Sequence, residues 1–224
     1  DPSLIPQLLD VAPWRLALRF PPRRLDRWPR FLRRDLPFAE RLLGSATLTL
    51  RGGAYQPVGD LSANLAWLGG LDGGCGDPSR PRVDVRARLE GGETRVDATG
   101  LVDDRRVLFA EARGATPVHT WLRAPESIRL PTTRATVWAV DVPLERLPFI
   151  CHEAEGPLTA SFELERLFGA RPSLVAEVSS DALRLRRTSA DGRPLDRSPP
   201  ASARVYAQLG NGRAHSEASV AWWN

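Results

Sequence analysis

Apolar and polar residues alternate with a period of two along much of this chain. In residues 83–89 (VDVRARL) every odd position is apolar and every even position is charged. Two glycines follow, and residues 94–98 alternate again, which predicts a β-hairpin with one dry face and one wet face. The same alternation recurs in residues 46–50, 61–67, 158–164, 183–185, 203–209 and 214–222. The pattern therefore predicts an all-β chain built mainly of antiparallel strands.

Helices are expected to be few, because proline interrupts most of the candidate segments. Residues 23–43 have a broken helical spacing of apolar side chains and predict one or two short helices near the N-terminal third. A shorter helical or turn-like piece is expected in residues 143–149. So little helix cannot cover the apolar side of ten or more strands.

An apolar sheet face must be covered, and the sequence leaves two solutions open. Two sheets could close on each other in a packed sandwich, which is the commoner arrangement. Alternatively, one long sheet could curl into an open groove with an apolar interior that holds an apolar ligand. Many inward positions carry a small side chain, which would leave volume unfilled in a packed core and so favours the groove. Tight packing of the sheets explains the small side chains equally well. These residues are Ala46, Ala63, Ala87, Ala98, Ala160, Ala176, Ala207 and Ala218.

The chain also repeats itself. Residues 85–100 align with residues 205–220 at an offset of 120, with apolar residues and glycines in matching positions. We therefore divide the chain into residues 1–22 as the end of a preceding repeat, residues 23–142 as a first repeat and residues 143–224 as an incomplete second repeat. All three parts are expected to form one continuous structural unit.

The order of features in the second repeat resembles the TamB family of translocation and assembly modules, which are relatives of the AsmA-like proteins. The resemblance rests on VPLERL at 142–147, GPLTASFEL at 156–164, GARPSLVA at 169–176, LRL at 183–185 and the closing hairpin. Residues 44–52 and 56–61 are a looser first copy of it. It covers most of the chain but not the Gly-rich segment near residue 75 or the region from Ala115 to Leu130.

The resemblance implies a curled β-taco that carries phospholipid through the periplasm, between the inner and outer membranes of a Gram-negative bacterium. It further implies an inner-membrane anchor and an Omp85-type outer-membrane partner, both reached through other parts of a longer chain. The missing start methionine agrees with an interior segment. The alternative is a closed sandwich or solenoid module that acts in outer-membrane protein (autotransporter) assembly without carrying lipid.

On the lipid interpretation, the large apolar side chains of inward parity line the groove and contact acyl chains. These residues are Leu48, Leu50, Leu61, Leu65, Trp67, Val85, Leu89, Val96, Leu158, Phe162, Leu164, Leu183, Leu185, Val205, Leu209, Val220 and Trp222.

No enzymatic motif stands out, so we predict no catalytic residues, no metal and no cofactor. The segment that starts at His152 fails the H-E-x-x-H pattern, because its fifth residue is Gly156. His119 and His215 are expected at the surface, and Asp103 and Asp104 in a turn between strands. Whether the two cysteines, Cys75 and Cys151, form a disulfide stays open.

The charge balance argues against a nucleic-acid partner. All 31 basic residues are arginine, they are interspersed with 27 acidic residues, and the net charge is only +4. One denser arginine cluster lies in residues 23–34. It predicts the solvated face of a short helix, with contact to an anionic membrane surface as the alternative.

Overall fold

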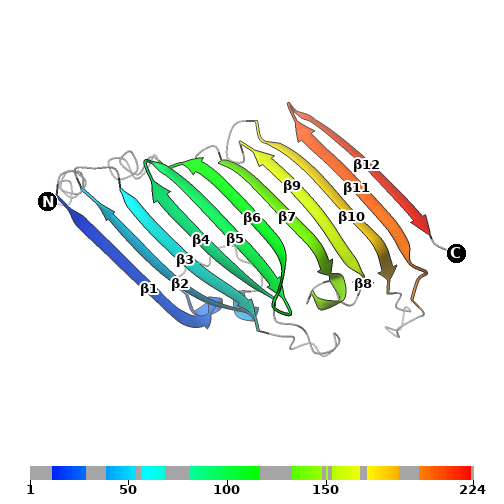
Figure 1. Ribbon diagram of the computed structural model, residues 1–224, viewed down its shortest axis with the longest axis horizontal. Helices are drawn as coiled ribbons and strands as arrows, with labels where there is room; N and C mark the ends of the chain where they lie inside the picture. The colour runs from blue at the N-terminus through cyan, green and yellow to red at the C-terminus, as the bar shows by residue number, and fades with distance from the viewer. Residues whose placement is uncertain are drawn as a thin grey trace.

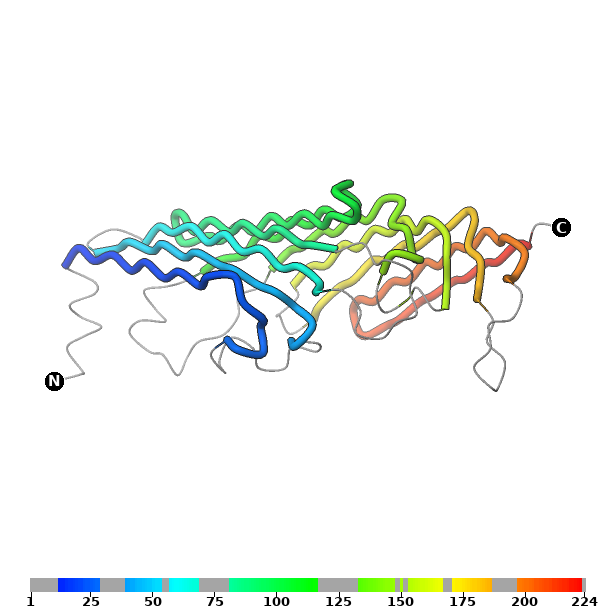
Figure 2. Tube along the Cα trace, turned by 90° about the horizontal axis from the view of Figure 1, so that it is seen from below, coloured from blue at the N-terminus to red at the C-terminus, as the bar shows by residue number. Residues whose placement is uncertain are grey.

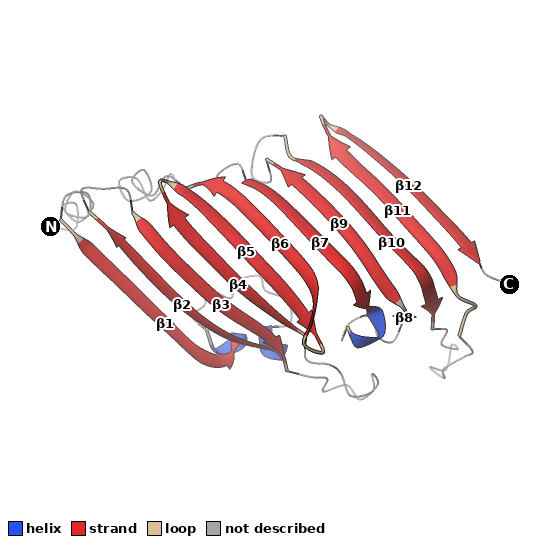
Figure 3. Cartoon of the chain, viewed as in Figure 1, coloured by secondary structure: helices blue, strands red, loops and turns tan. Residues whose placement is uncertain are grey.

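The described part of the chain forms one large, open, antiparallel β-sheet (Figures 1 and 3). This computed structural model describes residues 12–28, 39–53, 57–68, 81–116, 133–147, 150, 153–166, 171–186 and 197–222. The sheet has 12 strands in the order β1-β2-β3-β4-β5-β6-β7-β9-β10-β11-β12, with the two-residue β8 pairing with β10. Because neighbours in sequence are almost always neighbours in the sheet, the connections are local.

The strands are long, most having nine to eleven residues. Their bounds are β1 (Trp14–Arg24), β2 (Leu42–Gly52), β3 (Val58–Trp67), β4 (Arg82–Glu90), β5 (Glu93–Val102), β6 (Arg105–Ala115), β7 (Thr133–Pro143), β8 (Ala154–Glu155), β9 (Pro157–Glu165), β10 (Ser173–Leu185), β11 (Ala201–Gly210) and β12 (Arg213–Trp222). Every segment predicted from alternation lies within one of these strands. The prediction of an all-β chain with an antiparallel sheet is confirmed.

The short helices are smaller than the sequence predicted. Three 3-10 segments of three residues each are described: η2 (Leu25–Arg27), η3 (Ala39–Arg41) and η5 (Leu144–Arg146). η2 and η5 share the sequence pattern Leu-acid-Arg, and each follows a strand that ends in or near proline. Each of the two segments ends at an extended residue, Trp28 or Leu147, that precedes a proline in the sequence, and proline disfavours helical backbone in the residue before it. Residues 29–38 and 148–149, and with them half of the arginine cluster, lie outside the described residues.

Three tight turns join neighbouring strands, and in each both central residues have positive φ. The pairs are Gly91-Gly92, Asp103-Asp104 and Asn211-Gly212, with φ between 50° and 76°. This is the geometry of a type I′ turn, whose twist matches that of the flanking strands, and Gly, Asn and Asp tolerate it best. The predicted hairpins at residues 83–98 and 203–222, and the turn at Asp103 and Asp104, are confirmed.

The sheet arches, and its two ends lie far apart (Figure 2). Within the described residues no second sheet faces the first, so these residues form no closed sandwich. The η segments lie on the concave side of the arch (Figure 2). The open, curled sheet that the sequence offered as one of two solutions is therefore the observed fold.

Candidate apolar binding face

The strand register collects apolar side chains on one side of the sheet, which we call the apolar face. Residues paired across antiparallel strands point to the same side, so the pairing defines rows that run across the sheet. The central row is Leu18, Leu48, Leu61, Ala87, Val96, Ala112, Ala135, Leu164, Leu174, Leu209 and Ala214. It crosses eleven strands without one charged residue. The rows two residues away along each strand are also predominantly apolar.

All seventeen predicted lining residues lie on this face. Their cross-strand partners on the same face are apolar, small or, in one case, threonine. Their exposure differs, however. Trp67 and Leu89 are buried, most of the others are half-buried, and the most exposed lie at the C-terminal end: Leu185, Val205, Leu209, Val220 and Trp222. Parity read from the sequence therefore placed the side chains correctly, while exposure depends on neighbours that parity does not specify.

The η2 segment covers one end of the apolar face. Leu25 is 4% exposed, and the ring of Trp28 stacks on Phe20 with centroids 5.1 Å apart. Both side chains reach Gly44 of β2, where an added Cβ would lie 2.6 Å from Leu25 Cδ2 and 3.2 Å from Trp28 Cζ2. The absence of a side chain at Gly44 therefore lets η2 pack onto the sheet where β1 ends, β2 begins and β3 ends.

A second cover lies at η5, where Leu144 is also 4% exposed. Next to it in sequence is Val142, which belongs to a cluster of buried apolar residues: Val102, Val107, Ala139, Val142 and Ala160. Leu147, Leu158, Phe162 and Val178 pack against this cluster. The two η segments thus cover the apolar face along the margin where β1 and β7 end, and no other described segment covers it between them or toward β12.

The opposite side of the sheet, which we call the polar face, carries a compensated network of charges. Arg88, Arg95, Arg113 and Arg134 lie directly opposite one another on four successive strands. Like charges in this position repel, but each of these arginines lies within 4.0 Å of a carboxylate. The hydrogen bond from Arg113 to Glu111 is the main cause that lowers the pKa of Glu111 below its usual value, and nearby Arg95 also favours the carboxylate.

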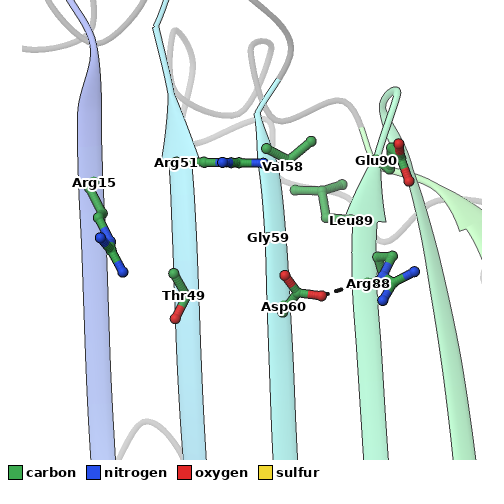
Figure 4. Close-up of a pocket in the computed structure, with 9 residues that line it drawn as sticks. All are labelled: Arg15, Thr49, Arg51, Val58, Gly59, Asp60, Arg88, Leu89 and Glu90. Atoms are coloured by element: carbon green, nitrogen blue, oxygen red, sulfur yellow. Dashed lines mark hydrogen bonds and ion pairs between the residues drawn. The ribbon is translucent and has the colours of Figure 1, made fainter.

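The polar face also has a shallow depression over β1 to β4, near the upper ends of these strands (Figure 4). Its volume is about 440 Å³, and its polar lining residues are Arg15, Thr49, Arg51, Asp60, Arg88 and Glu90. Sequence reasoning missed this depression. The signal was present, because Arg15 and Arg51 both occupy outward positions of alternating segments, but their pairing depends on the register between β1 and β2.

Sites of other kinds are not apparent in the described part of the chain. Among the described residues no group of three His, Cys, Asp or Glu side chains is placed to hold a metal ion. Across the same ranges, no helix has the length and apolar content that crossing a bilayer requires. His215 is on the polar side of β12, where its Nε2 lies 2.9 Å from Glu217 Oε1. His119, His152, Cys75 and Cys151 lie outside the described residues.

Comparisons with protein family models, with curated proteins and with solved structures find no match to this chain. Its function is therefore inferred from the geometry of the two faces of the sheet.

Proposed function

We propose that the apolar face binds the acyl chains of phospholipids, and that this chain is a segment of a TamB/AsmA-like lipid conduit. In this role it shields acyl chains from water on their way between the inner and outer membranes and supports outer-membrane biogenesis. The setting for this role is the periplasm, within an inner-membrane-anchored protein that works with an Omp85-type partner. The observation that carries the proposal is the continuous apolar row across eleven strands. No described residue covers this row between η2 and η5.

The energetics favour such a ligand. Moving an acyl chain from water onto an apolar surface gains about 0.8 kcal/mol for each buried CH₂ group. Several large side chains of the face remain 40–57% exposed, among them Leu18, Val205 and Val220. These side chains gather at the two edges of the sheet, and an exposed apolar group on neighbouring strands, such as Val205 and Val220, marks an interaction site in many proteins.

The shape of the face suits movement as well as binding. The central row contains only Leu, Val and Ala, so it offers an acyl chain similar contacts at each strand. Binding energy that changes little from strand to strand creates no deep trap along the row. A lipid can then slide across the sheet while its charged head stays in water.

A second candidate function is an assembly module that binds no lipid. It is favoured by β1 and β12, which are long edge strands of the described sheet, since exposed strand edges are templates for pairing with another chain. On that interpretation, the apolar face packs against protein.

Photo-crosslinking in cells that produce the protein tests the proposal. A photoreactive residue at Leu48 or Val205 lies on the apolar face, and one at Thr47 or Arg204 lies next to it in sequence but on the polar face. We expect crosslinked phospholipid, identified by mass spectrometry, at the first two positions and none at the other two. Crosslinks to protein alone at Leu48 and Val205 would favour the assembly module.

A charge placed on the apolar face gives a second test. Val205 is 43% exposed, so Val205→Glu is expected to fold and to reduce lipid crosslinking from Leu209 strongly. The matched control is Gln208→Glu, which puts the same charge on the polar side of β11. Equal crosslinking in both variants, with circular dichroism showing both folded, would overturn lipid binding at this face.

A further inference from the structure

The polar face has one corner whose positive charge is not compensated. On β1 and β2 this face presents Arg15, Arg19 and Arg51, and neither strand contains an acidic residue. In the described part of the chain, none of these three arginines has an ion pair or a side-chain hydrogen bond. This contrasts with arginines elsewhere on the same face that lie within 4.0 Å of a carboxylate: Arg82, Arg88, Arg95, Arg113, Arg134 and Arg204.

Register makes two of the three arginines direct neighbours. Arg15 pairs with Arg51 across β1 and β2, so both side chains leave the sheet on the same face, Arg15 along β1 and Arg51 across toward β3 (Figure 4). Two like charges directly opposite each other destabilise a sheet. Arg86 also lacks an ion pair within the described residues, but its cross-strand partners are Ser62 and Asp97, so it faces no second cation.

The surroundings of this pair form a cradle. Arg15, Arg51 and the hydroxyl-bearing Thr49 line the depression over β1 to β4 (Figure 4). Two carboxylates also line it, but Asp60 already accepts a hydrogen bond from Arg88 at 3.4 Å. Glu90 of β4 lies in the same cross-strand row as Arg51, with Val58 of β3 between them, so the two backbones are about 10 Å apart at the usual strand spacing. The side chain of Arg51 extends over Val58 (Figure 4) but forms no ion pair with Glu90.

We propose that Arg15, Arg51 and Thr49 bind a phosphate-class anion, either a phosphomonoester or a phosphodiester. Guanidinium groups form paired hydrogen bonds with phosphate oxygens, and an anion over Thr49 of β2 lies within reach of these two long side chains from neighbouring strands. An anion between Arg15 and Arg51 also removes their mutual repulsion. This site is on the opposite side of the sheet from the apolar face and does not depend on acyl-chain binding there.

The anion has two sources, a free phosphate compound or the head group of a lipid. The site lies one residue from the margin of the sheet, since Arg15 is the second residue of β1 and Arg51 the last but one of β2. On the apolar face of the same margin, the indole of Trp14 lies against Gly52, where an added Cβ would be 2.5 Å from Trp14 Cζ2. Both a soluble phosphate and a lipid at the margin therefore have access.

Isothermal titration with inorganic phosphate and with glycerol 3-phosphate, at low ionic strength, tests the site. We expect Arg15→Gln and Arg51→Gln each to weaken binding about tenfold, the loss of one charge-assisted hydrogen-bonding group. The matched control is Arg213→Gln, because Arg213 is exposed on the same face and its cross-strand partner is Gly210. Equal affinity in all four proteins, or no binding by the wild type at millimolar phosphate, would overturn the proposal.

Thermal unfolding gives an independent readout that a merely structural role would not produce. Without phosphate, Arg51→Gln should be at least as stable as the wild type, because the repulsion from Arg15 is gone. With phosphate, the unfolding temperature of the wild type should rise, and that of Arg51→Gln should rise clearly less because its affinity for phosphate is lower. A phosphate-induced rise of the same size in both proteins would contradict the site.

Vesicles separate the two sources. If a lipid head group is the ligand, phosphatidic acid vesicles should bind the wild type and release bound glycerol 3-phosphate, with Arg51→Gln binding them less. If the ligand is a soluble phosphate, glycerol 3-phosphate stays bound and the vesicles do not compete. Vesicle binding that is unchanged in Arg51→Gln would exclude the head group as the ligand of this site.

Discussion

Gly44 is the residue on which the cover at the N-terminal end of the apolar face depends. An added Cβ would meet Leu25, Trp28 and Leu65, all within 3.2 Å. Any larger side chain must push η2 away from the sheet or distort its packing. Close approach, rather than a special backbone angle, is therefore the reason for glycine at this position.

Substitution of Gly44 should separate the cover from the sheet. We expect Gly44→Val to lower the free energy of unfolding by about 1–3 kcal/mol, the usual cost of overpacking. Urea unfolding followed by tryptophan fluorescence measures the loss, since Trp28 reports on the cover. The control is Gly210→Val, because the nearest atom to an added Cβ there is Ser173 Cβ at 3.8 Å. A loss in the control as large as that at Gly44 would contradict the packing argument.

Glu111 gives the charge network of the polar face a pH dependence. It accepts hydrogen bonds from Arg113 Nε at 2.9 Å and also lies 3.0 Å from Arg95 Nη2. These contacts lower the pKa of Glu111 in the folded state. The stabilisation that ionised Glu111 gives the folded state is therefore fully present at pH values above its ordinary pKa of about 4.5, and it is lost as the pH falls through the lower pKa of the folded state. We expect Arg113→Gln to raise the pKa of Glu111. A pH titration of the carboxyl carbon of Glu111 by NMR measures this pKa. A carboxyl titration that does not move in Arg113→Gln would show that Arg113 is not the cause.

Among the elements, β12 depends most on its turn. All ten of its residues are exposed, and in the described sheet it pairs only with β11. Asn211 and Gly212 join the two strands with φ of 51° and 73°. Few packing contacts hold β12, so the turn geometry has a large share in holding it in register.

Replacing the turn glycine should therefore loosen β12 selectively. Gly212 has no atom within 4 Å of an added Cβ, so Gly212→Ala acts through backbone strain alone, at a cost of about 1–2 kcal/mol. Hydrogen exchange should quicken in β11 and β12 and stay unchanged in β4 and β5. Asn211→Gly keeps the turn geometry and should leave the exchange of β12 close to that of the wild type. Faster exchange throughout the sheet would mean that the hairpin does not open independently.

Alternation predicted most of the strands but not β1, β6, β7 or the two-residue β8, and for β6 and β7 the reason lies in two aromatic residues. Phe109 and Trp138 point to the polar face, where they lie directly opposite each other and are about 40% exposed. A large apolar residue at an outward position interrupts the period of two, so neither segment stood out. Their pairing across β6 and β7 is set by the register between the two strands, which neither segment shows by itself.

For the molecule as a whole, the sequence predicts on which side of the sheet a residue lies better than it predicts how exposed that residue is or which charges surround it. Period-two parity is a local property, and it assigned all seventeen lining residues to one side. Exposure and charge compensation are not local. Exposure depends on where η2 and η5 fold back onto the sheet. Charge compensation depends on the strand register, which pairs residues such as Arg15 and Arg51.

The open sheet also has consequences for association. β1 and β12 are the edges of the described sheet, and the apolar face reaches both through Leu18 and Val220, which are 40% and 57% exposed. Pairing between copies would extend the sheet and its apolar face together. We expect this chain to self-associate with rising concentration. Sedimentation velocity should show larger species for the wild type and mainly monomer for Val220→Lys, which puts a charge on the apolar side of the edge. Ser219→Lys, on the polar side of β12, should still associate, and equal loss of association in both variants would mean that the apolar face takes no part.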